Sequence, residues 1–183
     1  CMQNPHSKNK LESLGIEKSR LMVVGDPKFD TLPNSSQEKR TKARQKLCIA
    51  PLSMVWVAGS THEGEEEIIL DVHGRLREEF GNLILVLAPR RLERCVHVAG
   101  IITSKGTSFL RRSDQFGNSG HNFSVLLLDT IGELVEVYSI CDLAFVGRSL
   151  MAPGGGHNLI EPVAQGKPVL FGPFVENNKH NAD

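Results

Sequence analysis

The chain has 183 residues, with 21 lysines and arginines against 21 aspartates and glutamates, so its formal net charge is zero. This length fits one globular domain with a buried core, and a composition of 40% apolar and 23% charged residues is typical of such domains. No apolar run approaches the ~18 residues of a membrane span, and neither the balanced charge nor the 5% of aromatic residues fits a nucleic-acid-binding protein.

The two ends of the chain predict a piece of a larger protein. Residues 1–5 carry no basic segment followed by an apolar one, so we expect no signal peptide. Residues 177–183 are polar and predict no helix that could close a sheet. We expect residues 1–20 to be the tail of an interdomain linker or the last helix of a missing amino-terminal domain. Residues 21–183 should form a Rossmann-like domain, truncated at its carboxyl end.

Six short apolar runs predict β-strands. Each is four to six residues long, partly β-branched and apolar at consecutive positions, which is typical of a parallel sheet covered by helices on both faces. Short buried helices are the alternative, and they fit runs of this length less well. The runs are 21–24, 54–58, 83–88, 125–128, 143–146 and 168–171, and a further short strand is expected over 108–111.

The segments between the runs carry helical patterns. Apolar residues recur about every fourth position from Glu65 to Phe80, the spacing of a helix with one buried face. Further helices are expected over 36–47, 134–141 and 158–165. Alternating strands and helices predict an α/β fold, a doubly wound parallel sheet of the Rossmann type.

Two capping boxes mark expected helix starts, namely Ser60 with Glu63 and Thr130 with Glu133. The first of these helices carries glutamates at 63 and 65–67 near its start. Their carboxylates interact favourably with the positive end of the helix dipole and would repel a phosphate. We therefore expect the phosphate elsewhere, although Ser60 and Thr61 can line the same crevice.

No metal site is expected. His62 and Glu63 form half of a metalloprotease motif, but no second histidine follows at the fourth position, and helix capping explains the pair better. The cysteines are widely spaced, with no C-x-x-C pair, and predict reduced thiols rather than a disulfide framework or a zinc site.

Polar clusters follow five of the apolar runs. In an open parallel sheet, ligands bind beyond the carboxyl ends of the strands. Clusters that gather at one edge of the sheet therefore predict a ligand crevice there. They lie at 25–30, 59–65, 89–91, 129–133 and 147–158.

The glycine-rich segment 154–158 is the most specific local signal. Its glycines let the backbone approach a ligand, and the N–H groups of the following helix complete a predicted phosphate cradle. A flexible turn before an ordinary helix is the alternative, but the carboxylate of Glu161 suits two adjacent ribose hydroxyls and favours a nucleotide site. His157 either donates to the ligand or caps the helix.

Two cations come directly after apolar runs. The guanidinium of Arg90 can bind a phosphate through two parallel hydrogen bonds, and Lys28 adds a second positive charge. Solvated surface charges are the alternative, and the positions at strand ends favour binding. No Ser-His-Asp or Cys-His arrangement is evident.

Five motifs together resemble the 3-deoxy-D-manno-octulosonic acid (Kdo) transferases, over residues 23–173. They are Gly25 to Asp30, Ser60 to Glu66, Ala88 to Arg90, Asp129 to Leu134 and Gly155 to Pro162. The resemblance implies the GT-B architecture, in which two Rossmann-like domains face each other across a cleft. This chain resembles the carboxy-terminal, donor-binding half.

The resemblance also implies partners and a location. The donor would be CMP-Kdo and the acceptor lipid A or its precursor, with no metal or cofactor and no nucleic acid, and the membrane would be contacted only through the missing domain. The catalytic base would be a glutamate of that domain, so we expect no catalytic residue here and at best nucleotide binding by the chain alone. The expected location is the cytoplasmic face of the bacterial inner membrane, or the mitochondrion for a plant homologue.

The resemblance places CMP contacts on three short segments. These are Pro89 and Arg90, then Ile131, Gly132 and Glu133, then Asn158, Leu159, Ile160 and Glu161. The donor pocket is expected to include Lys28, Ser60, Thr61, Thr130, Gly155, Gly156 and His157 as well.

Three positions depart from the family pattern, which usually has His at Arg91, Gly at Arg148 and often Met at Ile131. Arg148 either adds a phosphate contact or obstructs the pocket. Two other functions stay open: a GT-B enzyme that uses a uridine nucleotide sugar, and a non-catalytic binding module on the same scaffold.

Overall fold

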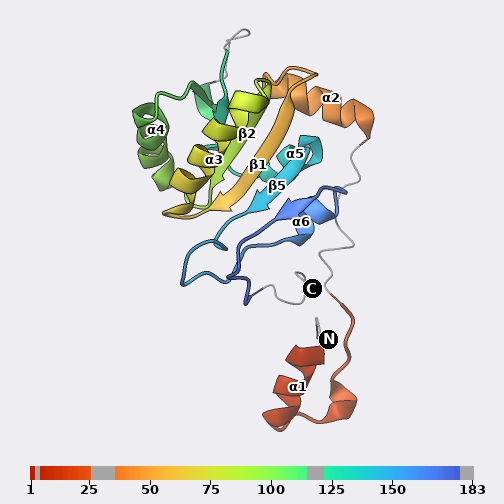
Figure 1. Ribbon diagram of the computed structural model, residues 1–183. Coiled ribbons are helices and arrows are strands. Elements are labelled where there is room, and N and C mark those ends of the chain that lie inside the picture. Colours follow the sequence, from red (N-terminus) through yellow and green to blue (C-terminus); the bar gives the residue numbers. More distant parts are fainter. Residues whose placement is uncertain (3–4, 26–35, 115–121, 178–183) are drawn as a thin grey trace.

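A sheet of six parallel strands organises the computed structural model, which describes residues 1–2, 5–25, 36–114 and 122–177 (Figure 1). The strands are β1 (Met54–Thr61), β2 (Leu83–Pro89), β3 (Phe109–Arg111), β4 (Val125–Leu127), β5 (Leu143–Val146) and β6 (Val169–Leu170). Their order is β3-β4-β2-β1-β5-β6. The predicted α/β fold is confirmed, as are the strand over 108–111 and five of the six apolar runs.

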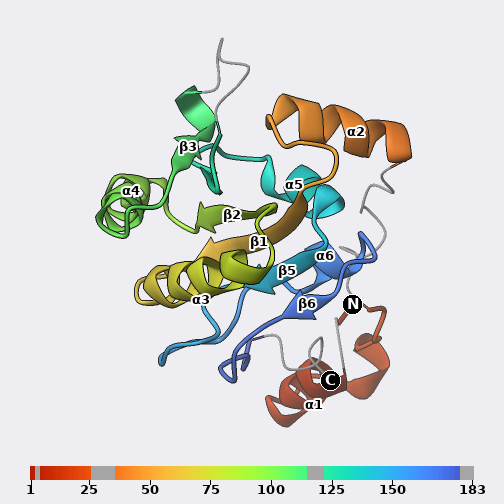
Figure 2. The ribbon, with the colours of Figure 1, turned by 45° about the horizontal axis from the view of Figure 1, so that its top comes forward.

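Helices cover both faces of this sheet (Figure 2). Alternate residues of β1 point to opposite faces, so Val57 joins one core cluster and Trp56 the other. The first cluster packs against α2 (Gln37–Lys46) and α5 (Leu134–Ile140), and the second against α3 (Glu65–Glu79) and α4 (Cys95–Ser104). Consecutive apolar residues in each strand therefore reflect burial on both sides, as predicted.

The remaining helical elements are short or peripheral. Helix α1 (Pro5–Ser13) buries none of its residues and lies apart from the sheet in Figure 1. Helix α6 (Ile160–Val163) is shorter than predicted, and 3-10 turns occupy Lys18–Arg20, Leu92–Arg94 and Arg112–Asp114. No helix within the described ranges has the length and apolar character needed to cross a membrane.

The predicted strand over 21–24 is wrong. Val23 forms only an isolated bridge with Met2, while Met22 and Val24 are 66% and 55% exposed. An apolar run becomes a central strand only where helices can cover it. The nearby helix α1 buries no side chain, so it offers no apolar face for this purpose.

The capping box of Ser60 with Glu63 is also wrong. Strand β1 continues to Thr61, so Ser60 still belongs to the strand, and α3 begins after Gly64, whose φ of +87° suits glycine. Thr130 does contact the Glu133 carboxylate through its hydroxyl, but no side chain caps α5. In contrast, Ser36 accepts a hydrogen bond from the Lys39 amide at 3.4 Å, where α2 was predicted to start.

The strand order creates a switch point between β1 and β5. From β1 the chain crosses to β2 on one side, and β5 later pairs with β1 on the other side. Ligands of doubly wound sheets bind beyond the carboxyl ends of the strands at such a point. The fold therefore directs the search to the loops that follow β1, β2, β4 and β5.

Candidate nucleotide site

Two adjoining cavities open at the carboxyl edge of the sheet. The first has a volume of about 440 Å³ and lies beside the loops that follow β2 and β4. The second, of about 300 Å³, extends toward α6. Both are lined by Ser60, Arg90, Gly132 and Leu134, so they form one continuous crevice at the switch point.

Most predicted site residues line this crevice, although whether they bind CMP stays a prediction. The lining includes Ser60, Pro89, Arg90, Thr130, Ile131, Gly132, His157, Asn158 and Glu161. Leu159 and Ile160 are buried, and the buried Thr61 donates to Glu66 at 3.1 Å. Glu133, Gly155 and Gly156 are not among the lining residues. Lys28 lies outside the described residues.

A network at α6 orients the carboxylate expected to meet the ribose. Asn158 Nδ2 donates to Glu161 Oε1 at 3.1 Å, and Asn158 Oδ1 accepts from the Ile160 amide at 3.1 Å. Asn158 therefore satisfies the first amide of the short helix and holds Glu161 at the same time. The carboxylate is presented to the crevice in a fixed orientation.

His157 pairs with His62, and no local motif reveals this contact because the two residues are 95 positions apart. Their Nε2 atoms are 2.8 Å apart and their ring centroids 5.0 Å apart. Burial, the neighbouring His62 ring and the cations Arg90 and Arg148 lower the pKa of His157 to about 4. Burial likewise lowers the pKa of His62. The neutral ring of His157, hydrogen-bonded to that of His62, therefore forms part of the crevice wall together with Arg90. Asn158, rather than His157, bonds the first amide of the helix.

Glu65 ties the two central loops together. Its buried carboxylate accepts hydrogen bonds from the amides of His62, Arg148, Ser149 and Leu150, at 2.8, 2.8, 2.8 and 3.0 Å. The turn after β1 and the loop after β5 are thereby joined through one side chain. The local sequence pattern links this carboxylate only to the helix dipole, because three of its four partners lie more than 80 residues away in the chain.

Arg148 neither enters the crevice nor obstructs it. The residue is exposed, is absent from the lining of both cavities and has a φ of +60°, in the left-handed region that favours glycine. This conformation explains why a glycine at this position suits the fold.

Substitution Arg148→Gly should raise the free energy of unfolding by about 1 kcal/mol, because it removes left-handed strain. Urea unfolding followed by circular dichroism measures the change. Arg148→Ala keeps the strained Cβ and should give no gain. A stability of Arg148→Gly at or below that of the unmodified chain would contradict this explanation.

Three amides that the predicted phosphate cradle would use are already bonded within the chain. The amide of Gly155 donates to the Phe174 carbonyl, Gly156 to Arg148 and His157 to Gly147, at 3.1, 2.9 and 3.2 Å. These N–H groups hold the loop against its neighbours and are already satisfied. Arg90, rather than the loop backbone, is therefore the group suited to bind a phosphate.

Glu133 lies in an ion-pair network outside the crevice. Arg112 and Lys46 approach its carboxylate to 3.0 and 2.7 Å, and the Thr130 hydroxyl contacts it as well. Burial alone would raise the pKa of Glu133, but these contacts lower it to about 2. The residue joins α2, the turn after β3 and the start of α5.

Glu133 should therefore stabilise the fold above pH 4.5 and cease to do so in acid. Its folded pKa of about 2 lies below the ordinary value of 4.5, so the stabilisation is complete above pH 4.5 and is lost as the pH falls toward 2. Glu133→Gln should lose roughly 2–3 kcal/mol at pH 7, and the difference should shrink in urea titrations near pH 3. Glu78→Gln, at an exposed position, should show no such trend. A pH-independent difference would contradict the assignment.

A doubly wound sheet with a polar crevice at its switch point defines a Rossmann-like domain of the GT-B type. The same fold occurs in the C-terminal CMP-Kdo binding domain of WaaA from Acinetobacter baumannii, which superposes with a TM-score of 0.72 at 32% identity, covering 80% of this chain and 75% of that one. The chain belongs to the 3-deoxy-D-manno-octulosonic acid transferase family, as the sequence motifs indicated.

Sequence relatives agree with this assignment. The 3-deoxy-D-manno-octulosonic acid transferase of Haemophilus influenzae is 38% identical over 176 residues, which are 96% of this chain and 40% of that protein. A relative from Arabidopsis thaliana, named a probable mitochondrial transferase of this kind, is 35% identical over 126 residues, 69% of this chain and 28% of that protein. The chain thus spans less than half the length of these relatives. No family model matches the sequence.

Proposed function

We propose that this chain is the donor-binding half of an inverting glycosyltransferase that uses CMP-Kdo. The observation that carries the proposal is the crevice itself, where Arg90 of the loop after β2 meets Asn158 and Glu161 at the start of α6. The related WaaA domain is named for CMP-Kdo binding. Glu161 would accept hydrogen bonds from the ribose hydroxyls, and Arg90 would pair with the phosphate.

In the proposed reaction, an acceptor hydroxyl attacks the anomeric carbon of Kdo and CMP leaves. Arg90 stabilises the negative charge that develops on the departing phosphate, in a crevice partly shielded from water. The acceptor is lipid A or its precursor, and the base that removes the hydroxyl proton is a glutamate of an amino-terminal half. No metal or cofactor takes part in this proposal.

The proposed setting follows the relatives. Such an enzyme would work at the cytoplasmic face of the bacterial inner membrane, with membrane contact through the amino-terminal half. A plant protein of this kind would work in the mitochondrion, as the name of the Arabidopsis thaliana relative suggests.

Calorimetry with CMP tests the proposal. The chain should bind CMP, and Arg90→Ala should weaken binding at least about tenfold, since charge-assisted hydrogen bonds contribute roughly 1.5–3 kcal/mol. Arg75→Ala removes an exposed arginine of α3 and should bind as the unmodified chain does. No heat at millimolar CMP, with circular dichroism showing a folded chain, would overturn the proposal.

Two further measurements separate the alternatives. If UMP binds to the crevice more tightly than CMP in a competition experiment, the donor would be a uridine nucleotide sugar. Absence of Kdo transfer after addition of a matching amino-terminal half, CMP-Kdo and lipid acceptor would favour a binding module without catalysis.

A further inference from the structure

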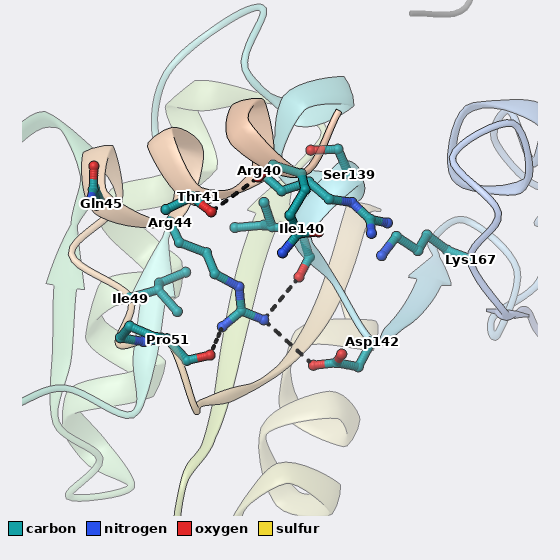
Figure 3. Close-up of a pocket in the computed structure, with 11 residues that line it drawn as sticks. Arg40, Thr41, Arg44, Gln45, Ile49, Pro51, Ser139, Ile140, Asp142 and Lys167 are labelled. Atoms are coloured by element: carbon teal, nitrogen blue, oxygen red, sulfur yellow. Dashed lines mark hydrogen bonds and ion pairs between the residues drawn. The ribbon is translucent and has the colours of Figure 1, made fainter. Parts of the chain in front are cut away.

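A second recess lies at the opposite edge of the sheet (Figure 3). Its volume is about 300 Å³, and it is lined by α2, the turn before β1, the end of α5 and the residue two positions before β6. Pro51, Asp142 and Lys167 each precede a strand, so the recess opens at the amino ends of the strands. The crevice described above lies at their carboxyl ends. The two sites are therefore separate.

The recess carries an excess of positive charge. Arg40, Arg44 and Lys167 line it, against the single carboxylate of Asp142. Asp142 lies 3.8 Å from Arg44 and accepts from the Val55 amide at 2.8 Å. Asp142 thus neutralises one of the three cations, and two positive charges remain within the recess.

Arg44 is a structural cation. Its guanidinium donates to the carbonyls of Ala50, Pro51 and Ser53 at 3.1, 3.3 and 3.0 Å, and to that of Ile140 at 3.3 Å. These bonds fasten the turn before β1 to the end of α5. The donors of Arg44 are therefore occupied by the chain itself.

Arg40 and Lys167 are placed differently. In Figure 3 the guanidinium of Arg40 and the ammonium of Lys167 point toward one another. The Nε of Arg40 is buried and has no acceptor among the described residues, and Lys167 donates one bond to the Cys141 carbonyl at 2.6 Å. Burial, followed by the charge of Arg40, lowers the pKa of Lys167. Like charges held together in a recess are unfavourable unless an anion joins them.

We propose that this recess binds a phosphomonoester, with its phosphoryl group between Arg40 and Lys167. A dianion matches the two unbalanced charges, and a planar guanidinium beside an ammonium offers several donors to the oxygens of one phosphoryl group. The Thr41 and Ser139 hydroxyls already donate to backbone carbonyls, at 3.0 and 2.6 Å, so they are not available as donors to the phosphate.

The remaining walls suit a small organic group attached to the phosphate. Ile49, Pro51 and Ile140 supply apolar surface, and a volume of about 300 Å³ is at the lower limit of small-molecule sites. A bare phosphate would leave this surface uncovered. We therefore expect a phosphomonoester to bind more tightly than inorganic phosphate.

Nuclear magnetic resonance titration tests this site independently of the nucleotide site. Glycerol 3-phosphate should shift the amide signals of α2 and of Lys167 saturably, and inorganic phosphate should do so more weakly. Arg40→Gln and Lys167→Gln should each weaken binding at least about tenfold. Lys39→Gln removes an exposed charge from the same helix and should leave the affinity unchanged.

The outcomes distinguish this site from the crevice. Arg90→Ala should weaken the response to CMP and keep the response of α2 to glycerol 3-phosphate, whereas Arg40→Gln should do the reverse. Equal affinity in Arg40→Gln and Lys39→Gln would overturn the proposal, and so would shifts that stay linear up to 50 mM, roughly the limit of useful affinity. Circular dichroism of each variant shows that the fold is retained.

Discussion

Replacing Glu65 by alanine should destabilise the chain by at least about 3 kcal/mol. The substitution removes the acceptor of four backbone amides, and each buried donor left without a partner costs roughly 1–3 kcal/mol. Urea unfolding followed by circular dichroism measures the loss. In the same samples, the spectrum at low denaturant shows whether the sheet still forms.

Two companion variants make this result specific. Glu63→Ala removes a carboxylate that is 85% exposed at the same helix start and should change stability by less than about 1 kcal/mol. Glu65→Gln keeps an oxygen for Ser149 and Leu150 but turns an NH₂ toward the amides of His62 and Arg148, so we expect an intermediate loss. Equal stability of Glu65→Ala and Glu63→Ala would contradict the assigned role.

Gly147→Ala should destabilise the chain to a similar extent. A Cβ at this position would lie 2.4 Å from the Ser60 carbonyl oxygen, 2.6 Å from the Thr61 Cα and 2.8 Å from Glu65 Oε2. Two of these atoms belong to the backbone of the central strand β1, which cannot move aside without disturbing both core clusters. We expect a loss of about 3 kcal/mol or more in urea unfolding.

Gly74→Ala provides the matched control. This glycine lies within α3, and a Cβ there would meet no atom within 4 Å. The substitution should therefore raise stability by about 0.5–1 kcal/mol, because alanine favours a helix more than glycine does. If Gly147→Ala were as stable as Gly74→Ala, the close approach of Gly147 to the backbone of β1 would be disproved.

Local patterns predicted the elements that are buried on both sides. The runs that became β1, β2 and β5 are apolar at consecutive positions because each face of the sheet has its own core cluster. The run at 21–24 has the same local pattern, and only its surroundings distinguish it. Sequence spacing carries no information about which helix will lie over a strand.

The site was predictable where it depends on strand ends. Arg90 and Glu161 follow separate strands and do converge in one crevice, as the general rule for doubly wound sheets requires. Other contacts join segments that are distant in the chain. They are the bonds of Glu65, the His62–His157 pair and the ion pairs of Glu133. Such partnerships arise from tertiary packing, and residue types in a local motif do not reveal them.

The junction made by Glu65 also bears on how a ligand would be received. Because one side chain fixes the turn after β1 to the loop after β5, these two segments cannot shift independently. Their conformational entropy is lost when the chain folds rather than when a ligand arrives. In such a preorganised site, less of the energy gained from contacts with the ligand is spent on ordering the chain, so the affinity is higher. Only exposed side chains such as Arg90 would still have to change conformation when a ligand binds.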